Sequence, residues 1–171
     1  MRFPGAIRCL AAAVAVSAVV PIVSCDKKTD EVAEPKTISV SIVNPSPTSN
    51  HLTDVAMLSG ETAVAVGYRG TIVRTVDRGE TWSDLGGRLE TDLHGLAFAD
   101  ASVGIAVGDE GTILRTIDGG LTWVPVDAPV EGALNDVCFF DSRHGVAVGS
   151  RGALARTADG GMTWEPLASV T

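Results

Sequence analysis

The sequence predicts an all-β protein built from three copies of one four-stranded unit. Three observations support this class. Near-identical segments of nine residues, 74–82, 115–123 and 156–164, return at an interval of 41 residues. Short runs rich in Val, Ile, Ala and Thr alternate with Gly, Asp and Ser, which is typical of strands and turns. Helical spacing of apolar residues is absent after residue 25.

The first segment of the chain, residues 1–25, has the pattern of an export signal. Arg2 and Arg8 precede an apolar stretch at 9–24, which is shorter than the roughly 20 residues of a membrane span. The final four residues, Ile22 to Cys25, resemble the lipobox of bacterial lipoproteins, in which the cysteine becomes the first mature residue and carries the lipid. We therefore expect a lipoprotein signal peptide over 1–25 and lipidation of Cys25. An ordinary signal peptide with an incidental cysteine is the alternative.

The segment that follows, residues 26–36, is charged and lacks apolar periodicity, so we expect a flexible charged tether. The predicted repeat domain occupies residues 37–171. It begins with a β-rich run at 37–43 (TISVSIV), which we expect to form a strand. From the signal peptide and the lipidated cysteine, we expect the protein to lie outside the cytoplasm, anchored to a membrane of the cell envelope on its periplasmic side.

Each repeat contains four short apolar runs, and each run has the length and residue type of a strand. The runs are 52–58, 62–67, 71–76 and 81–85 in the first repeat; 93–99, 104–108, 112–117 and 122–126 in the second; and 134–140, 145–149, 153–158 and 163–167 in the third. Four strands in about 41 residues is the period of a β-propeller blade. The second run of each repeat is apolar on both alternating faces, which predicts a strand covered on both sides by neighbouring blades.

The repeated nine residues contain the pattern T-x-D-x-G-x-T-W, which describes a complete corner between two strands. The aspartate can accept hydrogen bonds from nearby backbone N–H groups, the glycine can adopt positive φ, and the tryptophan can anchor the corner in the core. The residues of the three corners are Thr75, Asp77, Gly79, Thr81, Trp82; Thr116, Asp118, Gly120, Thr122, Trp123; and Thr157, Asp159, Gly161, Thr163, Trp164.

These corners resemble the Asp-box, or bacterial neuraminidase repeat, which is structural in its families and lies away from their active sites. The wider pattern AVGxxGxxxRTxDxGxTW is similar to the repeat of the photosystem II assembly and stability factor family. That resemblance implies a propeller without catalysis, with photosynthesis as the family's setting, that binds a protein of the reaction centre. The family has seven blades and this chain supplies only three repeats.

The sequence assigns no catalytic residue, metal ligand or cofactor. Sialidases, the enzymes most associated with Asp-boxes, use an arginine triad, a tyrosine nucleophile and acidic partners. Tyr68 is the only tyrosine. Arg74, Arg115 and Arg156 are equivalent positions of the repeat, so they should point the same way in three blades. We expect these arginines to form an interblade salt bridge or a cap over the box corner. Three histidines are scattered without metal-ligand spacing.

The charge of the chain restricts the classes of partner that we expect. The formal net charge is −8, so the chain repels phosphate backbones and we expect no nucleic acid. Cys138 is the one cysteine left in the repeats, and we expect it to be a small buried hydrophobe.

Functional residues should differ between repeats, whereas structural residues should recur. The turns between second and third strands read Tyr68-Arg69, Asp109-Glu110 and Ser150-Arg151, and the connections between repeats also vary. In a propeller these turns and connections share one face. We expect Tyr68, Arg69, His94 and Arg151 to contact a protein partner there; a solvated face without a partner is the alternative.

The sequence therefore predicts an exported, membrane-tethered, non-catalytic protein-binding module. A sialidase-like glycan hydrolase or a glycan-binding lectin is the second hypothesis, and a truncated gene product without an independent role is a third. Three blades leave two apolar blade faces uncovered. The ring is thus expected to be incomplete or completed by oligomerisation, with a homodimer giving six blades or the strand at 37–43 completing another blade.

Overall fold

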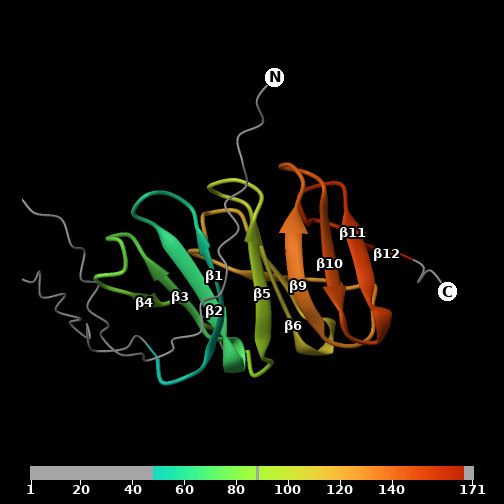
Figure 1. The fold of residues 1–171 in the computed structure, drawn as a ribbon, viewed down its shortest axis with the longest axis horizontal. Helices are drawn as coiled ribbons and strands as arrows, with labels where there is room; N and C mark the ends of the chain where they lie inside the picture. Colours follow the sequence, from blue (N-terminus) through green and yellow to red (C-terminus); the bar gives the residue numbers. More distant parts are fainter. Residues whose placement is uncertain (1–47, 88, 168–171) are drawn as a thin grey trace, which may run out of the picture. The chain divides into compact units, whose positions relative to one another are not determined.

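The computed structural model describes residues 48–87 and 89–167, which lie in one compact unit, Val43–Thr171 (Figure 1). The predicted signal peptide, Cys25, the tether and the strand at 37–43 fall outside these residues. The described part is all-β, as predicted, and forms three four-stranded antiparallel sheets. Each sheet follows the order of its strands in the chain, so each is one blade.

The strands match the repeats one blade at a time. Blade 1 consists of β1 (Leu52–Met57), β2 (Ala63–Gly67), β3 (Ile72–Thr75) and β4 (Ser83–Asp84); blade 2 of β5 (Leu93–Phe98), β6 (Gly104–Gly108), β7 (Ile113–Thr116) and β8 (Val124–Val126); and blade 3 of β9 (Leu134–Phe139), β10 (Gly145–Gly149), β11 (Leu154–Thr157) and β12 (Glu165–Pro166). A single 3₁₀ turn joins the second and third strands of each blade, at Tyr68–Gly70, Asp109–Gly111 and Ser150–Gly152.

The fourth strand of each blade is shorter than the sequence predicts. We expected five residues in each, and the structure has two or three. In β12 the proline Pro166 pairs with Ala155 and has no N–H to donate, and β8 carries Pro125. A short outer strand leaves little exposed edge for unwanted pairing.

The blades stand side by side in chain order, with their first strands adjacent, so that β5 contacts both β1 and β9 (Figure 1). We call the face of a blade that looks toward the next blade its forward face, and the opposite one its back face. The hydrophobic core lies in the two seams between blades. One cluster joins Val64, Val66 and Ile72 of blade 1 to Leu93, Leu96, Ala106 and Leu114 of blade 2; the other joins Ile105, Val107 and Ile113 of blade 2 to Leu134, Val137, Ala147, Ala155 and Trp164 of blade 3.

The described blades do not close a ring, and the burial of the second strands shows which blade lies at the end of the stack. Every residue of β2 and β6 is buried, as predicted for strands covered on both faces. In β10 the prediction is wrong, because no described blade covers its forward face. Val148 is 42% exposed, whereas the equivalent Val66 and Val107 are fully buried.

Cys138 is exposed, so the prediction of a buried hydrophobe is also wrong. The equivalent residues, Ala56 and Ala97, pack against the two seam clusters. Cys138 holds the same place on blade 3, where no further seam follows. Its exposure therefore comes from its position at the end of the stack.

Within each seam, the box corner of one blade rests on the forward face of the blade before it. An added Cβ on Gly161 would lie 2.3 Å from Ile105 Cδ1, and one on Gly120 would lie 2.8 Å from Val64 Cγ2. Both glycines also have positive φ, 78° and 84°. Glycine is therefore required here by the close approach of the blades as well as by the turn.

We predict that Gly161→Ala destabilises the protein more than Gly79→Ala does. Both positions have positive φ, so both substitutions cost about 1–2 kcal/mol of backbone strain. At Gly79 the nearest atom to an added Cβ is Trp82 Nε1 at 3.7 Å. At Gly161 the crowding against Ile105 adds about 1–3 kcal/mol. Urea unfolding of the two variants measures the difference, and equal losses would contradict the packing of the seam.

Candidate functional site

The box aspartates are occupied by their own corners. In blade 2, Asp118 Oδ1 accepts hydrogen bonds from Thr122 N at 2.9 Å and Thr116 Oγ1 at 2.8 Å, and Asp118 Oδ2 accepts one from Thr122 Oγ1 at 2.6 Å. Thr116 Oγ1 in turn accepts from Gly120 N at 3.0 Å. The same bonds occur around Asp77 and Asp159. These bonds stabilise the turn, and both oxygens of each carboxylate accept hydrogen bonds from the turn itself.

These hydrogen bonds also hold the carboxylates in the ionised form. The side-chain and backbone hydrogen bonds of Thr81 lower the pKa of Asp77 to about 2. At Asp118 and Asp159, desolvation raises the pKa, but hydrogen bonds led by those of Thr122 and Thr163 outweigh it and lower the pKa to about 2. A carboxyl group with so low a pKa is a poor general acid at neutral pH.

The three repeat arginines bind backbone or a nearby carboxylate instead of converging on one site. Arg74 Nε donates to Gly119 O of blade 2, and Arg115 Nε donates to Gly160 O of blade 3, both at 2.9 Å. Each of these bonds joins two blades at a box corner, which matches the expected cap over the corner; the acceptor is a backbone carbonyl and not the acidic side chain of a salt bridge. In blade 3, Arg156 forms a surface ion pair with Glu165 at 3.0 Å.

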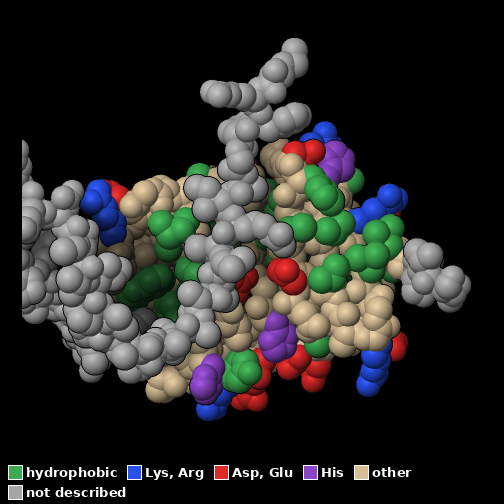
Figure 2. Space-filling view, in the orientation of Figure 1, with side chains coloured by type: hydrophobic (Ala, Val, Ile, Leu, Met, Phe, Trp, Pro, Cys, Tyr) green, Lys and Arg blue, Asp and Glu red, His purple; other side chains and the backbone are tan. Residues whose placement is uncertain are grey.

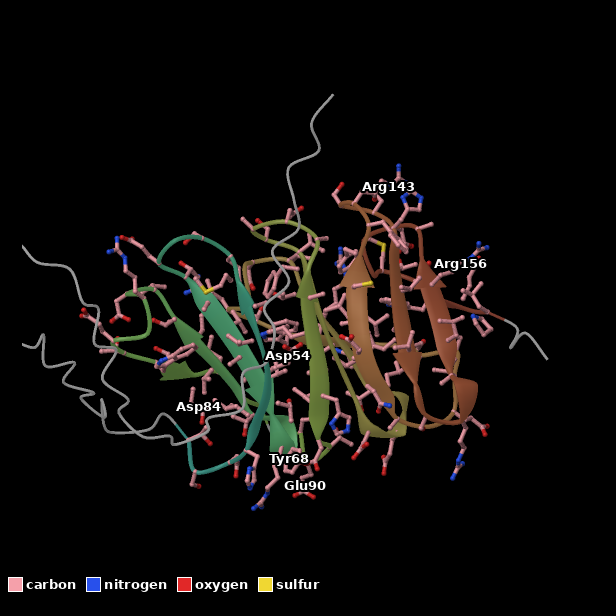
Figure 3. The ribbon with its side chains drawn as sticks, viewed as in Figure 1. Asp54, Tyr68, Asp84, Glu90, Arg143 and Arg156 are labelled. Atoms are coloured by element: carbon pink, nitrogen blue, oxygen red, sulfur yellow. The ribbon has the colours of Figure 1, made fainter. Side chains whose placement is uncertain are left out.

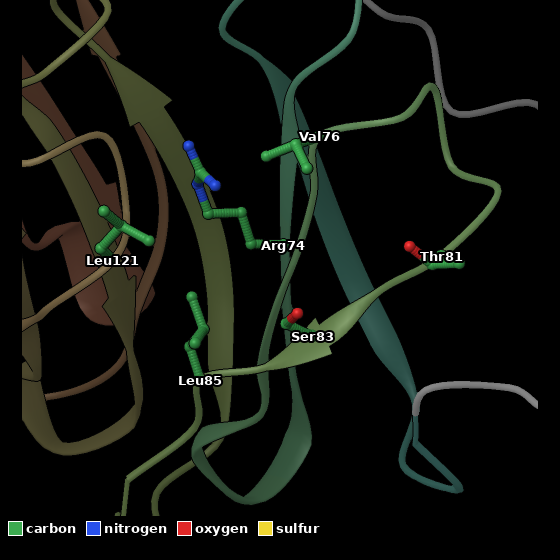
Figure 4. A pocket seen from close by; sticks show the side chains of 6 residues that line it. All are labelled: Arg74, Val76, Thr81, Ser83, Leu85 and Leu121. Atoms are coloured by element: carbon green, nitrogen blue, oxygen red, sulfur yellow. The ribbon is translucent and has the colours of Figure 1, made fainter.

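A small pocket opens on the outer seam between blades 1 and 2 (Figure 4). Its walls are Arg74, Val76, Thr81, Ser83, Leu85 and Leu121. The volume of about 130 Å³ is well below the roughly 300–1,000 Å³ of ligand pockets. We interpret it as a packing gap of the seam.

The four residues predicted to contact a partner lie along one edge of the blades, which we call the turn edge. It consists of the turns at 68–70, 109–111 and 150–152 and the residues beside them, and it lies opposite Arg143 in Figure 3. The three turns share one backbone, since Arg69, Glu110 and Arg151 each have φ of 57°. Side chains on this fixed backbone differ from blade to blade. Figure 2 shows basic, acidic, histidine and hydrophobic side chains along the same edge.

Hydrogen bonds connect the turn edge to the connections between blades. His94 of β5 pairs through Nε2 with Asp109 Oδ1 at 2.9 Å. The backbone N–H of Arg69 donates to Asp92 Oδ1 at 2.8 Å. Asp92 thus positions Arg69, and Asp109 positions His94. Both aspartates vary between the repeats, and this variation indicates in the sequence that they belong to the turn edge.

The aromatic part of the turn edge contains a residue that sequence reasoning missed. Tyr68 is 40% exposed, and its ring lies 5.5 Å from that of His51, at a tilt of 52°. The repeat places His51 at the position of Asp92 and Ala133, and this variability could have identified it. Tyr68, His51 and Arg69 together form a mixed aromatic and cationic patch.

Within residues 48–87 and 89–167, no three His, Cys, Asp or Glu side chains are grouped so as to hold a metal ion. The same part of the chain contains no helix long and apolar enough to cross a membrane.

Comparison with known proteins supports the repeat assignment. The family model described as photosynthesis system II assembly factor YCF48 matches residues 121–170, which span the third box and blade 3. No curated protein sequence matches the chain. The predicted resemblance to this repeat family is confirmed for the matched segment.

Solved structures extend the likeness to all three blades. YCF48 bound to a D1 peptide is 25% identical, with a TM-score of 0.63, over 71% of this chain and 40% of the other. YCF48 from Cyanidioschyzon merolae is 26% identical, with a TM-score of 0.64, over 74% and 42%. The chain thus spans about two fifths of these proteins. A GH74 enzyme of Niastella koreensis, at 17% identity and a TM-score of 0.59 over 68% and 22%, shares the fold.

We predict that the protein loses stability as the pH falls from about 4 to about 2. The pKa values of Asp77, Asp118 and Asp159 in the folded state are about 2, below the value of about 3.9 for an unfolded chain. The unfolded state therefore binds more protons in this range, and the stabilisation present above pH 4 is lost. Urea midpoints at pH 5, 3.5 and 2.5 measure the loss. Asp118→Asn should lower stability at pH 5 and flatten the dependence; an unchanged slope would contradict this assignment.

Proposed function

We propose that the chain is an exported, membrane-tethered, non-catalytic module that binds a protein segment along its turn edge. The observation that supports this most is the likeness to YCF48 bound to a D1 peptide, at 25% identity. That protein binds a peptide, and the present chain has three blades of the same construction. We propose an exported or membrane protein as the partner of this chain.

The turn edge suits such a partner. The central residue of each turn has the same φ of 57°, so the three turns present their side chains on one repeated backbone shape, which suits a binding surface. Tyr68, Arg69 and Arg151 are exposed and belong to the residue types that contribute most at interfaces. Between the two arginine-bearing turns lies the acidic pair Asp109 and Glu110. A segment of mixed charge with an apolar side chain for Tyr68 complements this pattern.

The pattern at 22–25 and the charged residues after it support the proposed membrane tether. Lipidation of Cys25 would fix the chain to a membrane, since more than one acyl chain gives stable anchoring. The tether at 26–36 would then separate the blades from the lipid surface. A partner that is itself a membrane protein meets the turn edge at a raised local concentration.

A glycan hydrolase or lectin is the second candidate. The likeness to the GH74 enzyme of Niastella koreensis favours it, although at 17% identity this shows the fold alone. The box carboxylates are hydrogen-bonded within their own corners, and Arg74 and Arg115 bond to carbonyls of the next blade, which favours a binding module instead. Hydrolysis of a fluorogenic sialoside by the purified chain would support the enzyme.

We predict that Tyr68→Ala with Arg151→Glu weakens partner binding by at least about tenfold, since aromatic and arginine anchors dominate interface energies. Binding is measured with a D1 peptide and with the membrane proteins that the wild-type chain captures after crosslinking in cells. Arg143→Glu is the matched control, because Arg143 is exposed on the opposite edge and carries the same charge (Figure 3). Equal binding by wild type and the double variant would refute the turn edge as the binding surface.

We also predict that Cys25→Ser moves the protein from the membrane fraction to the soluble fraction of the cell envelope. The reason is that removal of the acceptor thiol prevents lipid attachment. Fractionation and labelling with a fatty acid probe measure the effect. Cys138→Ser is the control and should leave the membrane fraction unchanged. Membrane association of both variants would count against the lipobox.

A further inference from the structure

The three turns of the turn edge are held by the same backbone hydrogen bonds in every blade. In each turn the first residue donates its amide to the carbonyl of the residue before the first strand: Tyr68 N to His51 O, Asp109 N to Asp92 O and Ser150 N to Ala133 O, at 2.8, 2.9 and 2.9 Å. The second residue of each turn then takes the left-handed conformation, with φ of 57° and ψ of 39°, 27° and 26°. The turns thus have one backbone shape, which is repeated once in each blade.

The side chains at these left-handed positions are not the ones that the backbone favours. Positive φ is uncommon for residues other than glycine, and among the rest it favours short polar side chains such as asparagine. The chain instead places Arg69, Glu110 and Arg151 there. A residue that the surrounding structure holds in a disfavoured conformation points to a function. The requirements of the turn therefore do not explain the charges of these three residues.

None of these three charges is neutralised within the described blades. The other non-glycine residue with positive φ, Arg78, forms an ion pair with Glu61 at 2.9 Å. Among the residues that the structure describes, no ion pair and no side-chain hydrogen bond joins Arg69, Glu110 or Arg151 to another side chain. All three are exposed, so their charges are available to a partner.

The charges follow the order of the blades and read basic, acidic, basic. The connections on either side of blade 2 add two further exposed acids, Glu90 and Glu131, to the acidic centre. Figure 3 shows Glu90 on the turn edge. A partner that complements this order carries an acid, then a base, then an acid, because other orders bring like charges together.

The packing of the blades sets the distance between these charges. The blades pack face to face at both seams, and sheets packed in this way are about 10 Å apart. A polyproline II segment rises about 3.1 Å per residue and has three residues per turn, so residues i, i+3 and i+6 lie on one side of it, about 9 Å apart. A β-strand changes sides at every residue, so it cannot present these three positions together.

We propose that Arg69, Glu110 and Arg151 form a charge ladder that binds a polyproline II segment with an acid, a base and an acid at positions i, i+3 and i+6. The two arginines donate to the carboxylates at the ends of this motif, and Glu110 accepts from the base between them. The charge ladder rests on the proposed function, since it names the class of segment that the turn edge binds. The tether at 26–36 contains no base with acids three residues before and after it, so a partner supplies the segment.

Four synthetic peptides with a fluorophore at one end provide the probes. The matched peptide has glutamate, lysine and glutamate separated by pairs of prolines, which favour the polyproline II conformation. The charge-reversed peptide has lysine, glutamate and lysine at the same places. The shifted peptide has the original charges separated by three prolines, and the flexible peptide has pairs of glycines in place of the prolines.

The binding of each peptide is measured by fluorescence anisotropy with the full chain in a non-ionic detergent. The same measurement is made with a triple variant, Arg69→Glu with Glu110→Lys and Arg151→Glu, in which the ladder is inverted. Arg78→Glu is the matched control, because it makes the same charge change at a residue with φ of 65° in the box corner of blade 1. Thermal unfolding of each variant checks that the blades are intact.

We predict that the wild-type chain binds the matched peptide at least about tenfold more tightly than the charge-reversed peptide and at least about threefold more tightly than the shifted peptide. The flexible peptide should bind more weakly than the matched one, because its ordering costs entropy. The triple variant should prefer the charge-reversed peptide, and Arg78→Glu should keep the wild-type preference. High salt should remove the preferences, because it screens exposed charges.

Equal binding of the matched and shifted peptides by the wild-type chain would overturn the charge ladder. An unchanged preference in the triple variant, or no binding of any peptide, would overturn it as well. The proposed function has a separate outcome. If the Tyr68→Ala and Arg151→Glu variant loses the partner captured in cells, the turn edge remains the binding surface, for a segment of different chemistry. If that variant keeps the partner, the proposed function fails too.

Discussion

The contact between the forward face of one blade and the box corner of the next is the interaction on which the rest of this structure depends. A four-stranded blade has no core of its own, because its apolar residues lie in the seams with its neighbours. Val64 and Ile105 are covered only when Gly120 and Gly161 come against them. The box must therefore be a tight turn as well as a flat surface. Its aspartate and threonines, bonded to one another, provide both.

Because of this constraint, the residues of the two edges of the blades differ in how freely they can be substituted. We call the edge that contains the box corners the box edge. On the box edge the aspartate and threonines of each corner serve the turn, and Arg74 and Arg115 serve the seams, as the bonds of Asp118 and Arg115 show. Substitution there changes stability first. On the turn edge the backbone alone is fixed, by a residue with φ of 57° in each blade, and the side chains vary without cost to the seams. Side chains on the turn edge can therefore differ from blade to blade and contact a partner, whereas the same differences on the box edge would disrupt the corners.

The same scaffold occurs in proteins that bind peptides and in proteins that cleave glycans, as the likeness to YCF48 and to GH74 enzymes shows. The fold alone does not decide between these activities. What separates them is whether carboxylates converge at one cleft. In the described blades, the box carboxylates are distributed one to each corner and held ionised by hydrogen bonds.

The sequence by itself determined the parts that recur, because a period of 41 residues exposes any residue that each blade needs. The four strands, the box corner and the edge that holds Tyr68 and Arg151 follow from it. It could not determine properties that depend on the neighbouring blade. The exposure of Cys138 and Val148, the carbonyl acceptor of Arg74 and the tilted contact of His51 with Tyr68 were decided by tertiary structure. The physical reason is that these properties depend on contacts between segments far apart in the chain, and for Cys138 and Val148 on whether a following blade covers the position.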